Sequence, residues 1–162
     1  MMQRDDAVIR PATLADLDGV HALEQACFDT DAQSRRSLRY LISRARSDFL
    51  IVLAAGHVVA DVVVLYRRNA GVARLYSIAV GDAARGRGLG VTLLGEAEIA
   101  AMGRGCHALR AEARQANVAS RALFARAGYR ERERLPGYYP ARAGETARED
   151  GIRLEKLLNP TE

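Results

Sequence analysis

The sequence is poor in several residue types that often mark a specific function. It has no tryptophan, one lysine (Lys156), two cysteines and three histidines. Aromatic residues make up 6% of the chain and are not interleaved with basic ones, which argues against a nucleic-acid-binding surface. The histidines fall on three different predicted elements, so we predict no metal site. Cys27 and Cys106 lack CxxC spacing, and we expect reduced thiols, as in a cytoplasmic protein.

Long hydrophobic runs are also missing. The apolar stretch over residues 49–66 is broken by Gly56, His57 and Asp61, and the opening MMQRDDAVIRP has no apolar core of signal-peptide length. The sequence therefore predicts no membrane segment, no targeting segment and a cytoplasmic location. Its 162 residues, 49% hydrophobic and 27% charged, predict one folded domain over residues 1–162.

The net charge of +4 comes almost entirely from arginine. Arginine binds phosphate and carboxylate through a planar fork of donors, so the composition permits an anionic ligand or an acidic partner. The alternative is that arginine simply takes the place of lysine on solvated surfaces.

Hydrophobic periodicity predicts an alternation of strands and helices. Helices are expected after a Thr13 cap over residues 14–27, and over 34–46, 89–102 and 117–127. Strands are expected over residues 7–10, 49–54, 58–66, 72–80, 107–113, 129–135 and 152–158, with a tight turn at AAGH and a Pro/Gly/Tyr loop before the last strand. This order predicts an α/β (α+β) protein with one mixed sheet covered by helices.

The stretch ARGRGLG lies between the strand-like LYSIAV and a predicted helix. Backbone N–H groups at such a helix start can bind a phosphate. The stretch lacks the lysine and the Ser or Thr of a nucleotide-triphosphate loop, and its glycines do not match GxGxxG. What is left is R-x-x-G-x-G, formed by Arg85, Gly88 and Gly90.

In this setting ARGRGLG resembles the acetyl-CoA pyrophosphate loop of the GCN5-related N-acetyltransferase (GNAT) superfamily. IRPATLADLDGV is similar to the first strand and helix of that superfamily. LRAEARQANVASRALFARAGYRE and GYYPARAGETARED resemble its ribosomal-protein alanine N-acetyltransferase (RimI-like) branch. The resemblance implies a mostly antiparallel sheet with helices on both faces, splayed at the cofactor site.

The resemblance also implies how acetyl-CoA is held. Backbone N–H groups of the glycine loop would bind the pyrophosphate, and the edge of the preceding strand would pair with the pantetheine amides and polarise the thioester carbonyl. The cofactor-binding residues expected on this basis are Ile78, Ala79, Val80, Arg85, Gly86, Arg87, Gly88, Leu89, Gly90, Val91, Asn117 and Phe124. Asn117 would be a good helix N-cap whatever the function.

The catalytic base implied by the resemblance is Glu112. A carboxylate that accepts a proton is useful because the attacking amine must be neutral. The alternative for Glu112 is a solvated strand residue paired with Arg110 or Arg114.

One residue departs from the RimI-like pattern. Phe124 stands where that branch has a tyrosine, the proposed acid for the leaving thiolate, and a phenyl ring cannot donate that proton. Tyr138 and Tyr139 are possible donors, although a place in a substrate loop is the simpler interpretation, and Tyr129 is expected in the core.

The sequence thus predicts an acetyl-CoA-dependent N-acetyltransferase acting on a primary amine, with a protein or peptide N-terminal amine as the first candidate. The acceptor groove would form between residues 34–46 and 138–149, where Arg35, Arg36 and Arg39 suggest an acidic acceptor or a solvated basic helix. The alternatives are a small-molecule amine acetyltransferase and a non-catalytic acyl-CoA-binding module. No nucleic-acid or membrane partner is expected, and the protein would be a monomer or a homodimer.

Overall fold

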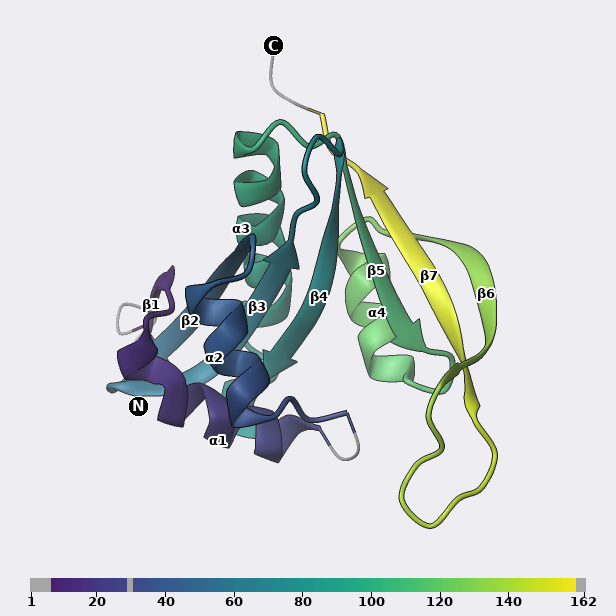
Figure 1. Cartoon of the computed structure of the whole chain (residues 1–162), viewed down its shortest axis with the longest axis horizontal. Helices are drawn as coiled ribbons and strands as arrows, with labels where there is room; N and C mark the ends of the chain where they lie inside the picture. The colour runs from purple at the N-terminus through teal and green to yellow at the C-terminus, as the bar shows by residue number, and fades with distance from the viewer. Residues whose placement is uncertain (1–6, 29–30, 160–162) are drawn as a thin grey trace.

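A computed structural model describes residues 7–28 and 31–159 of the chain, and its centre is one seven-stranded sheet (Figure 1). The strand order is β1-β2-β3-β4-β5-β7-β6, and every neighbouring pair is antiparallel except β4 and β5. The strands are β1 (Ala7–Pro11), β2 (Ser47–Ala54), β3 (His57–Leu65), β4 (Val72–Val80), β5 (Ala108–Arg114), β6 (Arg130–Tyr139) and β7 (Glu149–Leu157). The helices are α1 (Leu17–Cys27), α2 (Arg35–Ser43), α3 (Leu89–Gly103) and α4 (Val118–Arg126), with 3₁₀ turns η2 (Leu14–Asp16) and η3 (Asp82–Ala84).

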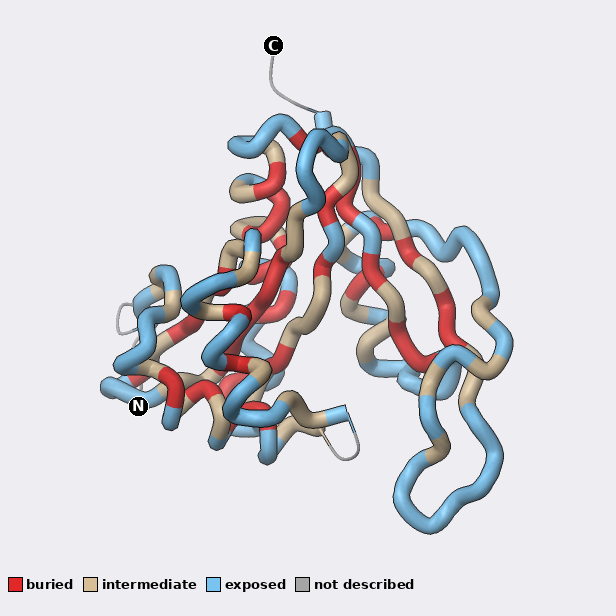
Figure 2. The backbone as a smooth tube through the Cα atoms, viewed as in Figure 1, coloured by how far each residue is buried: buried red, intermediate tan, exposed pale blue. Residues whose placement is uncertain are grey.

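Helices cover the sheet unequally. Leu17 of α1 and Leu38 of α2 pack on Ile51 and other residues of β2 and β3, on one face. Leu93 and its neighbours on α3 form a larger core on the other face, where α4 also lies. The face of the sheet on which α1 and α2 lie carries no helix over β5, β7 and β6 in the described part of the chain (Figure 1). Buried residues line β5 and β7, and β6 is mostly exposed (Figure 2). None of the helices described is long and apolar enough to cross a membrane.

Two of the predicted helix starts are confirmed by their caps, whereas the helix predicted from residue 14 begins with the 3₁₀ turn η2 and becomes α1 at Leu17. The side chain of Ser34 accepts a hydrogen bond from the backbone N–H of Ser37, and the Asn117 side chain does the same for Ser120. The sequence predicted this helix to continue to residue 46, but α2 ends at Ser43. Two successive N–H groups, of Arg44 and Ala45, bond to the Tyr40 carbonyl and close the helix.

The last hairpin is longer than the sequence predicted. Tyr138 and Tyr139 belong to β6 rather than to a loop, and β7 begins at Glu149 rather than at residue 152. The β6–β7 register skips between Leu135 and Tyr139, where the N–H of Gly137 donates to the Asp150 carboxylate at 2.8 Å. This irregular pairing accommodates the Pro-Gly pair, which is tolerated in an edge strand.

β4 and β5 separate after four paired residues. Val72–Leu75 pair with Ala108–Ala111, but β4 continues to Val80 and β5 to Arg114 without pairing to each other. Tyr76 is an extra residue at this point, because Val64 opposes Leu75 whereas Val63 opposes Ser77. Such a bulge bends a strand and ends regular pairing. The predicted splay of the sheet is confirmed, and we call this divergence of β4 and β5 the fork.

Candidate active site

A cavity of about 650 Å³ opens at the fork. Its walls come from the unpaired end of β4, from the segment that leads into α3, from α4 and from the end of α1. A volume of this size suits an elongated small-molecule ligand. Of the cofactor-binding residues predicted from sequence, those that line the cavity are Ile78, Ala79, Val80, Arg85, Gly86, Gly88, Leu89, Gly90, Val91 and Asn117.

The glycine loop at the cavity has the backbone of an anion site. Gly86 and Gly88 have φ angles of +78° and +72°, in the left-handed region, and a Cβ atom at either would extend into open space. Gly88 is the N-cap of α3 and supplies no side-chain cap to the helix. The first N–H groups of α3 have no partner within the helix and lie at the positive end of the helix dipole. Because this end of α3 lines the cavity, a phosphate is favoured there.

The two arginines of the loop lie on different sides of it. Arg85 lines the cavity, donates from Nε to the Val80 carbonyl at 3.2 Å and pairs with Asp82 at 3.1 Å. Arg87 lines a separate hollow of about 620 Å³ next to the ends of β1 and β2, so the structure does not bring it to the cavity.

One face of α4 forms the opposite wall, and sequence analysis missed it. The cavity-lining residues of this helix are Ala119, Ser120, Leu123 and Arg126. They recur at helical spacing after Asn117, which is the signal that could have identified them. Cys27 and Phe28 at the end of α1 also line the cavity, and nothing in their local sequence indicates this.

Phe124 does not reach the cavity. It lies one residue beyond Leu123, about 100° further round the helix, and is buried in the core. Its ring packs edge-on against Tyr129, with 5.1 Å between centroids. The expectation that Phe124 contacts the cofactor is therefore not met by this geometry, whereas Tyr129 is in the core as predicted.

Glu112 lies at the apex of the fork. It is the first residue of β5 after the last pair with β4, and its side chain is 11% exposed. Its partner is Arg74, whose Nε lies 3.3 Å from Oε2, and not Arg110 or Arg114. The carboxylate is thus held at the divergence of the two strands by a cation from β4.

Two tyrosines at the end of β6 stand close to Glu112. Their rings meet edge to face at 4.9 Å, and the hydroxyl of Tyr138 accepts a long hydrogen bond of 3.4 Å from Arg74. Burial raises the pKa of Tyr139, and the charge of Glu112 raises it further. Tyr139 therefore keeps its proton at neutral pH and can donate it in a hydrogen bond.

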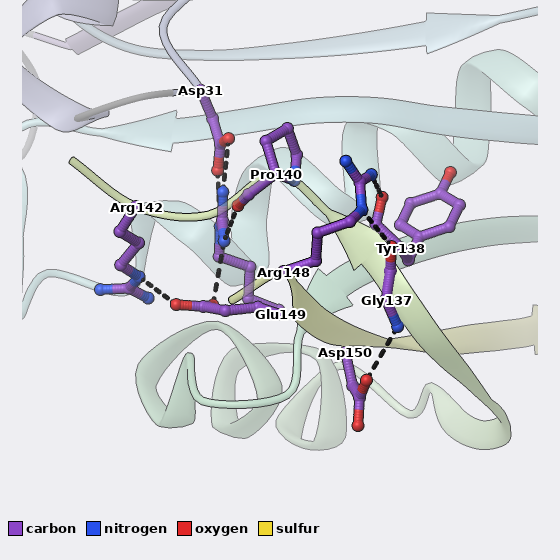
Figure 3. A network of polar contacts seen from close by, with 9 residues as sticks. Asp31, Gly137, Tyr138, Pro140, Arg142, Arg148, Glu149 and Asp150 are labelled. Carbon is purple, nitrogen blue, oxygen red and sulfur yellow. Dashed lines mark hydrogen bonds and ion pairs between the residues drawn. The ribbon is translucent and has the colours of Figure 1, made fainter. Parts of the chain in front are cut away.

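Arg114 ties the two sides of the fork together. Its guanidinium makes two hydrogen bonds, of 2.7 and 2.8 Å, to Asp31 from the segment between α1 and α2. It also pairs with Glu149 at 2.9 Å and donates to the Pro140 carbonyl at 3.2 Å. Figure 3 labels three of its partners, Asp31, Pro140 and Glu149. The guanidinium lies over the Tyr139 ring, 4.8 Å from the ring centroid. The side chain is 7% exposed, and its contacts raise its pKa. We call this set of contacts the Arg114 clasp.

Two carboxyl groups are buried, one on α1 and one on the neighbouring strand β3. Asp61 of β3, which pairs with Ala79 of β4, is fully buried, and neither of its oxygens has a hydrogen-bond partner within the described residues. Burial raises its pKa well above the ordinary value, and nearby Glu24 raises it further. Glu24 accepts a hydrogen bond from the N–H of Gln33 at 2.9 Å, and burial raises its pKa too.

A forked mixed sheet with a glycine-rich helix start at one end of the gap and a carboxylate at its apex is the arrangement that the resemblance to acetyltransferases predicts. The model of the Acetyltransferase (GNAT) family matches residues 17–129. An uncharacterized N-acetyltransferase of Methanocaldococcus jannaschii is 32% identical over 133 residues, which are 82% of this chain and 83% of that protein. The chain belongs to the GNAT acetyltransferase family, as the resemblance predicted.

Solved structures agree with this assignment. The crystal structure of the ribosomal-protein-S18-alanine N-acetyltransferase from Escherichia coli is similar with a TM-score of 0.83 and 24% identity, over 96% of each chain. The ribosomal-protein-alanine N-acetyltransferase from Brucella melitensis is 28% identical with a TM-score of 0.75, over 93% of this chain and 99% of that one. The Escherichia coli structure shows the likeness of the fold, and the family supports acetyl transfer to an amine.

Proposed function

We propose that this protein transfers an acetyl group from acetyl-CoA to the N-terminal amine of a protein or peptide. The observation that carries the proposal is the fork, with an anion site at one end and Glu112 at its apex. The N-terminal acceptor is supported by the likeness to the Brucella melitensis ribosomal-protein-alanine N-acetyltransferase.

The residues present fit acetyl-CoA. The N–H groups at the start of α3 would hold its pyrophosphate, with Arg85 at the rim of the cavity. Residues 78–80 of β4 have no partner in β5, so their backbone groups are available to amides of the pantetheine arm. Acetyl-CoA supplies the activated acyl group, and every other part of the chemistry falls to the chain.

Glu112 would act as the general base. An amine in its ammonium form has no lone pair, so it must lose a proton before its nitrogen can bond to the acyl carbon. The carboxylate of Glu112 would accept that proton, directly or through one water, before the nitrogen bonds to the acyl carbon. The second proton of the nitrogen would leave with the sulfur when the carbon–sulfur bond breaks, which gives the free thiol of CoA. Arg74 beside it and Tyr138 hydrogen-bonded to Arg74 would keep the carboxylate in place.

The test is Glu112→Gln, with Glu131→Gln as the matched control. Glu131 is an exposed glutamate on β6 that is paired with Arg121 of α4. We expect the Glu112 variant to lose roughly 10²- to 10⁴-fold in kcat/KM and to show an altered pH dependence, with the Kd for acetyl-CoA retained. The control should keep the wild-type rate. An unchanged rate for Glu112→Gln would remove it as the base.

The acceptor class is tested separately. CoA release is measured with peptides that have free N-termini and with small amines, next to acetyl-CoA binding by calorimetry. Faster turnover of the peptides supports the proposal. Turnover of small amines alone would indicate a small-molecule acetyltransferase, and tight binding of acetyl-CoA without turnover on any amine would indicate a non-catalytic module.

A further inference from the structure

Two arginines stand side by side at the base of the fork. Arg74 of β4 and Arg110 of β5 are partners in the parallel register, one pair before the strands separate. Their neighbours Ala73, Leu75 and Leu109 belong to the core on the α3 side. Because successive side chains of a strand alternate between faces, Arg74 and Arg110 both lie on the face that carries no helix at β5.

These arginines form the outer layer of a charged patch. The side chains of Arg74 and Arg110 are 47% and 50% exposed. Their carboxylate partners lie deeper, because Glu112 is 11% and Glu155 is 15% exposed. Glu155 is moreover shared with Arg132, at 3.8 Å. The patch therefore presents guanidinium groups to solvent and keeps its carboxylates underneath.

The charges and hydrogen-bond donors of Arg74 and Arg110 can accommodate a further anion. Like charges that face each other across two strands repel, and each carboxylate relieves this repulsion only in part. The two hydrogen bonds of Arg74, at 3.3 and 3.4 Å, are long and use Nε and Nη2, whereas a guanidinium has five N–H donors. Its guanidinium also lies over the Tyr76 ring, 5.5 Å from the centroid. A carboxylate bridging the two arginines would reduce their repulsion and accept short, charge-assisted hydrogen bonds.

We infer that Arg74 and Arg110 form a carboxylate-binding site for the acceptor, an inference that rests on the proposed function. Arg110 and Glu112 are two residues apart on one strand face, about 6.6 Å along the strand. An acceptor whose amine is at Glu112 would thus place a nearby carboxylate against the arginines. The acceptor is a primary amine with a carboxylate a few bonds away, either an acidic side chain near a peptide N-terminus or a free amino acid.

The arginines of α2 do not form this site. Arg35 pairs with Asp18 of α1, and Arg39 lines a separate hollow with Leu14 and Ser43. The acidic acceptor that was expected from α2 is therefore assigned to arginines of the sheet instead.

The experiment compares matched acceptors. Acetylation is measured for peptides Ala-Glu-Ala-Ala and Ala-Gln-Ala-Ala with amidated C-termini, and for free glutamate and glutamine amide. We expect kcat/KM to be about tenfold higher for the acidic member of a pair, and the pair with the larger preference identifies the source of the carboxylate. In Arg110→Gln the acid-to-amide ratio should fall to about one. Arg134→Gln, on β6 and paired with Asp150, is the control and should retain the ratio.

The outcomes separate the two proposals. Turnover of neutral and acidic acceptors at equal rates, unaffected in ratio by Arg110→Gln, would overturn the carboxylate site and leave the acetyltransferase intact. Absence of turnover on every amine would overturn the proposed function and this inference with it. A preference that survives in Arg110→Gln and in Arg74→Gln would show that another group recognises the carboxylate.

Discussion

Asp61 offers a direct test of how a buried carboxyl group acts on stability. It is fully buried and has no hydrogen-bond partner among the described residues, so it is neutral in the folded protein at low pH. The Asp61→Asn substitution keeps nearly the same size and hydrogen-bonding atoms but cannot ionise. We expect this variant to become progressively more stable than the wild type as the pH rises.

The sign follows from proton binding in the two states. The pKa of Asp61 is raised in the folded state above its ordinary value of 3.8, so above pH 3.8 the folded chain holds a proton that the unfolded chain has released. The stability that Asp61 contributes is complete below pH 3.8. It declines as the pH rises, until the pH passes the pKa of Asp61 in the folded protein. The decline is about 1.4 kcal/mol per pH unit. Glu24 shifts in the same direction but is present in both proteins.

Urea denaturation at pH 5, 6, 7 and 8 measures this effect. The free energy of unfolding of Asp61→Asn minus that of the wild type should increase by about 1.4 kcal/mol per pH unit, up to the raised pKa of Asp61. Asp18→Asn, at an exposed aspartate, is the control, and its difference from wild type should stay within about 0.5 kcal/mol. A difference between Asp61→Asn and wild type that does not vary with pH would refute the reasoning.

Two further predictions concern the anion site and the clasp. Gly88→Ala and Gly56→Ala both place a side chain at positive φ and should each lose about 1 kcal/mol of stability, but only Gly88→Ala should weaken acetyl-CoA binding, by about tenfold in calorimetry. Equal affinities would contradict the anion site. Arg114→Lys keeps the charge but not the two parallel bonds to Asp31, so we expect a loss of about 1–2 kcal/mol and faster hydrogen exchange in residues 140–148. Unchanged exchange there would mean that the clasp does not hold the hairpin.

Features that depend on neighbours in sequence could be predicted. The pattern of apolar residues located the antiparallel strands β2, β3 and β4. Ser34 and Asn117 marked the starts of α2 and α4, because the side chain of a cap bonds to a backbone N–H three residues further on. The glycine loop was also recognisable, since a helix start that lacks side chains is a local property. The family resemblance added the fork, which no local pattern predicts.

Features that depend on contacts between distant parts of the chain could not be predicted from the sequence. Glu112 pairs with Arg74, 38 positions away, and Arg114 reaches Asp31 across 83 positions. The side that Phe124 presents follows from the packing of α4 on the core, and a helix of nine residues has apolar positions on more than one side. The candidate site was therefore predicted well in its backbone and poorly in its ion pairs.

The core behind the fork has a consequence for ligand binding. It joins residues from both sides of the gap, with Val62 and Leu75 on one side and Leu109 and Leu154 on the other, all packed under α3. The strands are therefore held apart by the same contacts that stabilise the fold, and the gap does not have to open when a ligand arrives. The entropy of arranging the cavity is lost during folding rather than during binding, which favours affinity. Movement is left to the opposite, helix-free side, where the described contacts across the gap are the Arg114 clasp and the long bonds of Arg74 to Glu112 and Tyr138.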